Sequence, residues 1–267
     1  LGIPTIRDRA LQALLKLVIE PEWEAKFEPN SYGFRPGRNC HDAVKALAGF
    51  CHQKPRYVLD ANIAKCFDKI DHAKLLDKLG YSGSFRRQIL FWQKSGVLDN
   101  DIFSETEMGT PQGGVISPLL ANIALHGLEQ HLTEFIQTLD IPDTGRIRKR
   151  KMEKSRKASS FGIIRYADDF VVLHEQKWVV LALKTEIIRF LQDIGLELSE
   201  TKTRLTHTLA LSPKDTEDEG FDGNIGFDFL GFTFRHFPSK YRSAFDSKGR
   251  LLGHKLLIYP SEKKCRL

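Results

Sequence analysis

Two adjacent carboxylates, Asp168 and Asp169, stand between two short apolar runs in the stretch FGIIRYADDFVVL at residues 161–173. Each run is rich in β-branched or aromatic residues, so the pair predicts a β-hairpin with the two aspartates at its tip. Neighbouring carboxylates repel each other, and a divalent cation with oxygen ligands is the natural compensation. An ordinary surface turn is the alternative, because turns favour Asp for local reasons.

Other segments must position these carboxylates. The stretch RYVLDANIAKCFD at residues 56–68 predicts a strand that runs into a turn or short helix. Side chains two residues apart on a strand share a face, so Asp60 and Asn62 are expected to point to the same side. The loop GTPQGGVISP at residues 109–118 allows a close approach of backbone or ligand, and it opens an apolar helix expected over residues 119–138.

Hydrophobic periodicity predicts the remaining elements. Helices are expected near the N-terminus as far as Pro21, which should end that segment, and over residues 42–51, 72–79, 85–94 and 179–194. Residues 195–204 predict a strand and turn that carry Lys202, and residues 212–223 predict a loop. The run FDFLGFTFR at residues 227–235 predicts two strands joined at a Gly bend.

Charge and composition indicate the kind of partner, the cellular location and the state of the cysteines to expect. The 267 residues carry a formal net charge of +6 with a sequence pI of about 9.1, which favours a polyanionic partner. No apolar run approaches the ~18–20 residues needed to span a bilayer, and no signal peptide is visible. We therefore expect a cytoplasmic location, in a bacterium or an organellar interior. The cysteines Cys40, Cys51, Cys66 and Cys265 show no disulfide spacing and are expected to be free thiols.

Two basic segments suit contact with RNA or DNA. The loop SYGFRPGR at residues 31–38 places Arg35 and Arg38 beside aromatic residues, an arrangement that suits phosphate contact and base stacking. Pairing of these arginines with nearby acids is the alternative. The run RIRKRKMEKSRK at residues 146–157 predicts an insertion that is disordered when free and contacts nucleic acid. It has eight basic residues in twelve, among them Arg148, Lys149, Arg150 and Lys151.

Taken together, these segments resemble the reverse transcriptase region of group II intron-encoded proteins. The matching stretches occur in the family's order and cover nearly the whole chain: LGIPTIRDRALQ, SYGFRPGRNCHDAV, residues 60–72, GTPQGGVISPLLANI, RYADDFVVL, LELSETKTRL and FDFLGFTFRH. The YADD tip also differs from the GDD that viral RNA-dependent RNA polymerases usually carry.

The resemblance implies an α+β fold, with the fingers and palm of a right-hand polymerase, an antiparallel palm sheet and a thumb largely absent. Part of the fingers is expected at residues 1–55. The palm is expected at residues 56–236, with fingers elements and a basic insertion near residues 140–160. Residues 237–267 would connect toward the missing thumb, and any DNA-binding or endonuclease domain would lie outside this chain.

The resemblance also implies nucleotidyl transfer with two Mg²⁺ ions. Asp168 and Asp169 would hold these ions, with Asp168 as the more direct bridging ligand. Phe67 is expected to be the aromatic gate that stacks under the incoming sugar and clashes with a ribose 2′-hydroxyl. Gln112 is expected to contact the incoming nucleotide, and Tyr166 is expected to pack near the primer terminus.

The third metal carboxylate departs from the family pattern. It is expected six residues before Asp68, where this chain has Asn62. An Asn offers one neutral carbonyl oxygen, which weakens a Mg²⁺ site and removes one negative charge. Asp60 shares the face but lies about 6.6 Å back along the strand, at ~3.3 Å per residue, so it is only a fallback ligand. We therefore expect polymerase architecture with reduced catalysis.

Two functions are consistent with these residues. One is an RNA-directed DNA polymerase that copies the intron during retrohoming, with Lys202 as a general acid toward the pyrophosphate. The other is a non-enzymatic maturase, an RNA-binding splicing cofactor that needs the basic surface but not the metal triad. The expected partners are group II intron RNA, target DNA and deoxynucleoside triphosphates, with no membrane. The sequence does not define an oligomeric state.

Overall fold

The structure, a computed structural model, describes residues 3–52, 54–99, 102–104, 108–109, 113–143, 152–209, 221–239 and 251–262. A central five-stranded sheet has the order β4-β5-β1-β6-β7. Its strands are β4 (Gly162–Tyr166), β5 (Asp169–His174), β1 (Tyr57–Asn62), β6 (Arg204–His207) and β7 (Phe221–Ile225). Neighbouring strands are antiparallel except β6 and β7, which run parallel. The α+β class is confirmed, although the sheet is mixed at this edge.

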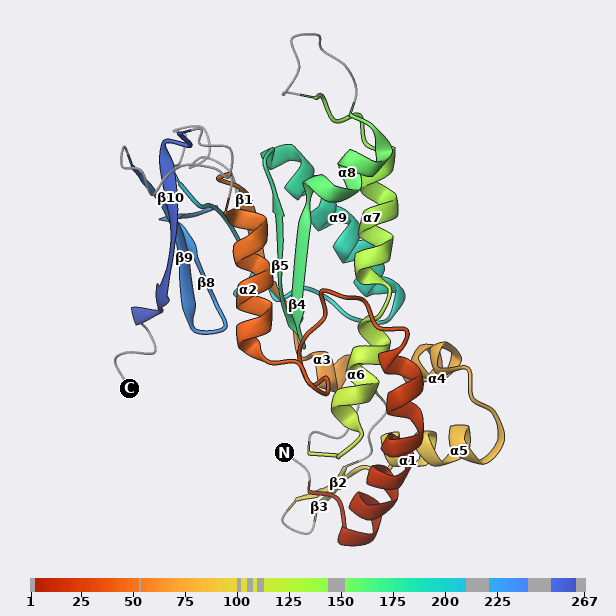
Figure 1. Cartoon of the computed structure of the whole chain (residues 1–267). Helices are drawn as coiled ribbons and strands as arrows, with labels where there is room; N and C mark the ends of the chain where they lie inside the picture. Colours follow the sequence, from red (N-terminus) through yellow and green to blue (C-terminus); the bar gives the residue numbers. More distant parts are fainter. Residues whose placement is uncertain are drawn as a thin grey trace.

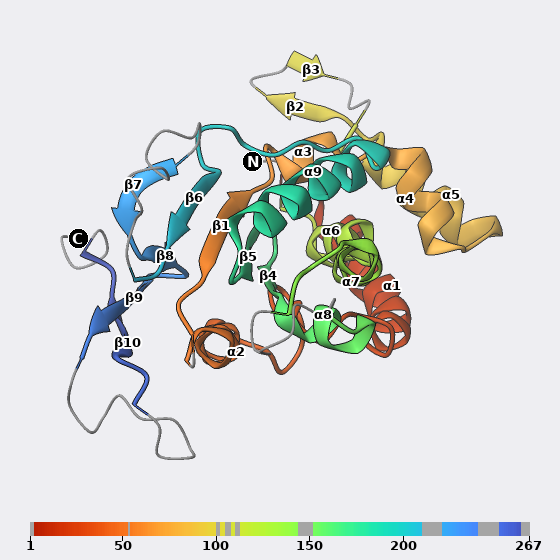
Figure 2. The ribbon, with the colours of Figure 1, turned by 90° about the horizontal axis from the view of Figure 1, so that it is seen from above.

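Helices cover both faces of the central sheet. The helix α9 (Lys177–Asp193) packs on β1 and β5, and α7 (Leu128–Thr138) packs on α9. Figure 2 shows α2 (Cys40–Cys51) on the opposite side of the sheet, where it contacts β4. Along β5, Phe170 and Val172 join the hydrophobic cluster on the α7 and α9 side, whereas Val171 and Leu173 join the cluster on the α2 side. Burial on both faces explains why the hairpin arms are continuous apolar runs.

A smaller antiparallel sheet stands beside the central one (Figure 1). Its order is β10-β9-β8, with β8 (Phe227–Phe229), β9 (Phe232–Pro238) and β10 (His254–Pro260). Leu230 and Gly231 make the turn from β8 to β9 and both have positive φ, at 49° and 86°. The rings of Phe227 and Phe234 stack with centroids 5.1 Å apart. The expected strand pair at residues 227–235 is therefore confirmed.

The remaining described elements surround the ends of the central sheet. They are α1 (Ile6–Glu24), α3 (Cys66–Lys69), α4 (His72–Leu79), α5 (Gly83–Gln93), α6 (Ser117–Leu125) and α8 (Lys154–Ser160), with a hairpin of β2 (Val97–Asp99) and β3 (Ile102–Ser104). The helices expected at residues 42–51, 72–79, 85–94 and 179–194 are confirmed within two residues. Cys40, Cys51 and Cys66 are free thiols. In the described parts of the chain, no helix is long and apolar enough to cross a membrane.

Two helix boundaries expected from the sequence were wrong. Pro21 does not end α1, which continues to Glu24 so that Trp23, 4% exposed, packs in the core. Pro21 cannot donate a backbone hydrogen bond, but the burial of Trp23 in the core stabilises the last turn of the helix by more than this loss costs. The single helix expected over residues 119–138 is two helices, α6 and α7, because Gly127 between them adopts φ 94°.

The expectation of a disordered basic run was also wrong for its C-terminal half. Residues 154–157 belong to α8, where Lys157 is buried and its Nζ donates to the Gln137 carbonyl oxygen at 3.1 Å. Arg156 pairs with the buried carboxylate of Asp143. Buried hydrogen-bond acceptors on and after α7 therefore fix two of the basic side chains. Residues 144–151 lie outside the described part of the chain, as does most of the expected loop at residues 212–223.

Replacing Phe170 by Ala tests whether the β4–β5 hairpin, which has helices on both faces, contributes strongly to the stability of the fold. Phe170 is fully buried, so the cavity should lower the free energy of unfolding by about 3–5 kcal/mol, measured by chemical denaturation. Phe91 on α5 is 66% exposed and gives the matched control. Phe91→Ala should change that free energy by no more than about 0.5 kcal/mol. Equal losses in the two variants would contradict this assignment of the core.

Candidate functional site

The two aspartates lie at the turn that joins β4 to β5. Tyr166 pairs with Asp169, which leaves Ala167 and Asp168 as the two turn residues, with Ala167 at φ 58°. Such a left-handed turn suits a two-residue hairpin. Asp168 is half-buried and Asp169 is exposed. Burial raises the pKa of Asp168 above its ordinary value, and the charge of Asp169 raises it further, while hydrogen bonds and Lys202 oppose the rise.

Asn62, the last residue of β1, faces this turn. The register of β1 with β5 places Asn62 directly opposite Asp169, and the Asn62 Nδ2 donates a hydrogen bond to Asp169 Oδ1. Asn62 is 9% exposed, so little of its side chain reaches solvent. The structure therefore brings together the three positions that the sequence assigned to one metal site. With its amide nitrogen engaged, Asn62 has only its amide oxygen left to offer a cation.

The oxygen donors at this site suit a hard divalent cation, but they are fewer than in a carboxylate triad. Over the described residues there is no group of three or more His, Cys, Asp or Glu side chains that could hold a metal. The fallback residue Asp60 sits two positions back on β1, opposite Val171 on β5 and Arg204 on β6. The donor set thus fits a weak Mg²⁺ site built on Asp168 and Asp169.

A buried arginine lies beneath the turn, and sequence analysis missed it. Arg165 is 3% exposed, and its Nη1 donates to Asn122 Oδ1 at 3.0 Å and to the Ala167 carbonyl oxygen at 3.3 Å. Burial lowers the pKa of Arg165 to about 10, so the guanidinium stays charged at neutral pH. The sequence did hint at a buried arginine, because Arg165 is the one charged residue in the otherwise apolar or aromatic β4 segment GIIRY.

A loop next to β4 holds the same turn from another side. Residues 30–32 pair with the backbone of Arg165 through N···O distances of 2.9 and 2.8 Å. Gly33 follows, and Asn122 Nδ2 donates to its carbonyl oxygen at 2.7 Å. A Cβ on Gly33 would lie 2.3 Å from the backbone nitrogen of Ala167, so only glycine allows this approach. Asn122 therefore links the loop and the turn through one side chain.

The turn after β1 is held by a second close backbone approach. Phe67 and Asp68 lie inside α3, which begins at Cys66 directly after Lys65, a residue with φ 47°. Gly109 lies against them with φ 88°, and a Cβ there would come within 2.6 Å of both their carbonyl oxygens. His72 Nε2 is 2.5 Å from the Gly109 carbonyl oxygen. The start of the GTPQGG loop is thus fixed beside Phe67.

A cleft of about 570 Å³ opens from the carboxylates toward the smaller sheet. Asn62 and Asp169 line one end of it, and residues of β8, β9 and the end of β10 line the other side. Lys202, Arg204 and Arg235 add positive charge to its wall. Asp60, Asp169, Asp228 and Glu262 line the same cleft, so its wall carries charges of both signs. The three cations beside Asp169 are the groups that suit a ligand with phosphate groups.

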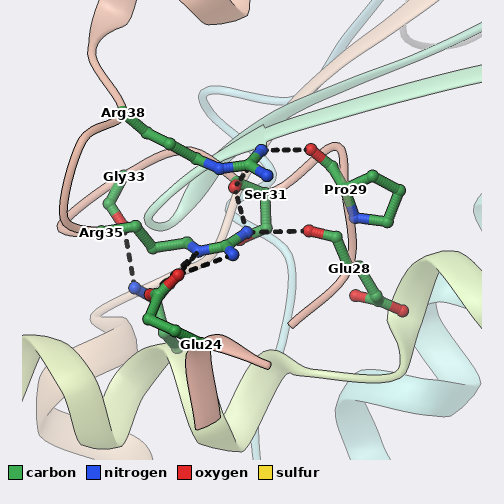
Figure 3. Close-up of polar contacts among 8 residues, drawn as sticks. Glu24, Glu28, Pro29, Ser31, Gly33, Arg35 and Arg38 are labelled. Atoms are coloured by element: carbon green, nitrogen blue, oxygen red, sulfur yellow. Dashed lines mark hydrogen bonds and ion pairs between the residues drawn. The ribbon is translucent and has the colours of Figure 1, made fainter. Parts of the chain in front are cut away.

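The expected RNA contact of Arg35 is corrected by its surroundings, which Figure 3 shows. Arg35 is 7% exposed, and its Nε and Nη2 donate to the Glu24 carboxylate at 2.8–3.1 Å. Its Nη1 donates to the carbonyl oxygens of Glu28 and Ser31, each at 2.8 Å. These contacts favour the ion-pairing alternative, in which Arg35 supports the loop.

Arg38 differs from Arg35 in exposure. It is half-buried, with its guanidinium 5.1 Å from the Tyr32 ring, and it donates to the carbonyl oxygens of Pro29 and Ser31 (Figure 3). It therefore remains a candidate RNA contact. Lys202 is exposed and Tyr166 is half-buried, as the proposed roles require. Five further candidates lie outside the described residues: Gln112, Arg148, Lys149, Arg150 and Lys151.

Paired carboxylates at the end of a largely antiparallel sheet, beside a cleft that carries lysine and arginine side chains, are the kind of arrangement that nucleotidyl transfer uses. Residues 1–234 match the family described as reverse transcriptase (RNA-dependent DNA polymerase), and the chain belongs to that family.

Individual relatives agree with this assignment. The chain is 31% identical over 255 residues to the group II intron-encoded protein LtrA of Lactococcus lactis subsp. cremoris, a match that covers 78% of this chain and 42% of that relative. It is 31% identical over 265 residues to protein YkfC of Escherichia coli K12, covering 90% and 64%. The resemblance to group II intron-encoded proteins is confirmed. The chain spans less than two thirds of the length of both relatives.

A solved structure supports the fold. The apo telomerase of Candida tropicalis, truncated from its C-terminal domain, superposes with a TM-score of 0.57 at 11% identity. The match covers 85% of this chain and 44% of the telomerase chain. At this identity the likeness shows a reverse transcriptase-like fold alone.

The raised pKa of Asp168 predicts a stability effect that depends on pH. Because the folded state holds the Asp168 proton more tightly than the unfolded state, ionisation of Asp168 destabilises the fold as pH rises between the two pKa values, and the penalty persists above them. Asp168→Asn should therefore raise the melting temperature at pH 7 without divalent ions, and the gain should vanish below the ordinary pKa of Asp. The control is the exposed Asp77, whose change to Asn removes an ion pair with Arg86 and should not raise the melting temperature at pH 7. A gain from Asp168→Asn that does not vary with pH would contradict the electrostatic cause.

Proposed function

We propose that this chain is the fingers and palm part of a group II intron-encoded reverse transcriptase and maturase. It copies RNA into DNA by nucleotidyl transfer and binds the intron RNA for splicing and retrohoming. The observation that carries the proposal is the hairpin turn of Asp168 and Asp169 facing position 62 across the β1–β5 pair. Family membership and the intron-encoded relative support it. Residues 1–55 would belong to the fingers, residues 56–236 to the palm, and residues 237–267 to the connection toward a thumb.

Each candidate residue of the site would have its own role in nucleotidyl transfer. Asp168 and Asp169 would hold Mg²⁺, which when bound neutralises the triphosphate and activates the primer hydroxyl. Phe67 would stack under the incoming sugar, and Tyr166 would pack near the primer terminus. Lys202, exposed on the cleft wall close enough to lower the pKa of Asp168, would donate a proton to the leaving pyrophosphate.

Asn62 should reduce catalysis without disturbing the architecture. Its amide donates to Asp169, so the side chain is accommodated by a hydrogen bond rather than by a shared cation. One of three negative charges is missing, and one oxygen of Asp169 is already engaged. The site should therefore bind divalent ions weakly while the hairpin keeps its geometry.

A second function follows from the same observation. Binding of intron RNA needs the basic surface but no metal triad, so a non-enzymatic maturase would survive the loss of a ligand at position 62. The net charge of +6 and the run at residues 146–157 favour this alternative for the chain as it stands. In either function the partner is group II intron RNA. Target DNA and deoxynucleoside triphosphates are partners of the polymerase alone.

Primer extension on an RNA template separates the two functions. In the complete gene product, Asn62→Asp should restore a carboxylate ligand worth several kcal/mol of charge stabilisation, and so raise the extension rate about 100-fold or more. The rate of single-nucleotide incorporation at saturating Mg²⁺ is the measurement.

Two further variants locate the ligands. In the Asn62→Asp background, Asp169→Asn should abolish extension, because Asp169 faces position 62 in the turn. Asp60→Asn should leave most of the gain in place. Robust extension by the parent protein that Asp60→Asn abolishes would instead make Asp60 the true third ligand.

The salt dependence of RNA binding tests the maturase role. Each phosphate contact contributes about 0.7–0.9 to the slope of log affinity against log salt. Replacing Arg148, Lys149, Arg150 and Lys151 by Gln should therefore lower the slope for intron RNA by about 2–4. The control replaces four cations that already pair with acids, Lys16, Lys26, Lys54 and Arg86, and should lower it less. Equal slopes in the parent and the first variant would exclude this run from the RNA interface.

A further inference from the structure

Phe34 lies in the SYGFRPGR loop but has no role in the proposed function, and it has an unusual backbone conformation. Its φ is 59°, in the left-handed region that bulky side chains rarely adopt. Such a conformation is costly and persists only when the surrounding structure enforces it. The ring gains little burial in return, since Phe34 is 51% exposed. Folding stability alone therefore does not explain a phenylalanine at this position.

The chain on both sides of Phe34 is fixed in place. On one side, the Gly33 carbonyl oxygen accepts a hydrogen bond from Asn122 at 2.7 Å, and Gly33 touches the backbone of Ala167 in the aspartate turn. On the other side, Arg35 is buried and bonded to Glu24 (Figure 3). These two buried neighbours hold Phe34 in its strained conformation. They also fix its backbone beside Gly33, which packs against the aspartate turn.

The ring of Phe34 meets the ring of Phe67. The two centroids are 6.2 Å apart and the planes are inclined at 75°, the edge-to-face arrangement that aromatic pairs prefer. Phe67 is itself half-buried, and Gly109 packs against its carbonyl oxygen from the other direction. The backbone of Phe67 is therefore held in place, and the Phe34 ring is in edge-to-face contact with the Phe67 ring.

We propose that Phe34 is a positioning residue for the sugar subsite: it holds the Phe67 ring in the orientation that excludes a ribose 2′-hydroxyl. The inference rests on the proposed polymerase function and on Phe67 as the sugar gate. Phe34 touches no reacting atom in this role. Its effect reaches the substrate through Phe67, so it should govern the choice between deoxyribonucleotides and ribonucleotides more than the overall rate.

The experiment measures kcat/KM for a deoxyribonucleotide and for its ribonucleotide on an RNA template, in the complete gene product carrying Asn62→Asp. The test variant is Phe34→Asn, because Asn tolerates the left-handed backbone while removing the ring. Loss of an aromatic pair should lower the deoxyribo-to-ribo ratio about 2- to 10-fold. Phe34→Tyr keeps the ring and should preserve the ratio. Phe91→Ala removes a ring on α5 that is 66% exposed and should also leave the ratio unchanged.

A double-mutant cycle shows whether Phe34 acts through Phe67. Phe67→Ala should lower the ratio by itself, and Phe34→Asn added to Phe67→Ala should lower it no further. The melting temperature of Phe34→Asn should equal or exceed that of the parent, since backbone strain is relieved. A lower melting temperature with an unchanged ratio would make Phe34 a structural residue and overturn the inference.

Failure of this inference is distinguishable from failure of the proposed function. If Phe67→Ala lowers the ratio and Phe34→Asn does not, the positioning role is overturned and the polymerase function stands. Additive effects of the two variants would also overturn it, because Phe34 would then act independently of Phe67. If the Asn62→Asp protein incorporates no nucleotide of either kind, the polymerase function falls and the inference falls with it.

Discussion

The buried guanidinium of Arg165 is the interaction on which the rest of the site depends. A charged group that loses its hydration is destabilised by several kcal/mol unless hydrogen bonds replace the lost water. Here Nη1 donates both replacement bonds, to the amide oxygen of Asn122 and to the carbonyl oxygen of Ala167, the residue before Asp168, whereas the buried Nη2 has no partner among the described residues. The same Asn122 holds Gly33. One buried cation thus ties β4, α6, the loop at residues 30–33 and the aspartate turn into a single rigid unit.

Because these contacts hold the turn, its backbone geometry does not depend on the charges of the candidate metal ligands. Arg165, Gly33 and Asn122 help to position the turn, and none of these three residues is a candidate metal ligand. An Asn at position 62 can therefore replace a carboxylate and satisfy Asp169 by a hydrogen bond, while the hairpin stays in register. Under the proposed function, polymerisation and RNA binding would depend on different residues, so the loss of a metal ligand at position 62 would leave the RNA-binding surface unchanged.

The local parts of the fold could be predicted from the sequence. Apolar runs around a polar tip identified the hairpin, and strand alternation put Asp60 and Asn62 on one face, since both follow from the chain within a few residues. The family resemblance, not periodicity, assigned Asn62 to the same site as the two aspartates. The errors came from long-range effects. Pro21 stays inside α1 because Trp23 is buried, and Lys157 is ordered because a carbonyl at the end of α7 accepts its hydrogen bond. No local pattern carries such information.

The sequence by itself determined the reverse transcriptase family and the constellation of Asp168, Asp169 and Asn62, because motif order and residue type are properties of the chain. Only the tertiary structure decided how the basic and aromatic side chains around the site pack. Arg35, for which the sequence left RNA contact and ion pairing open, is buried in an ion pair, and Arg165, which the sequence analysis did not single out, is also buried. Phe34 meets Phe67 across 33 positions of sequence. The physical reason is that burial and ring contacts depend on which distant segments pack together, and a linear pattern does not specify that packing.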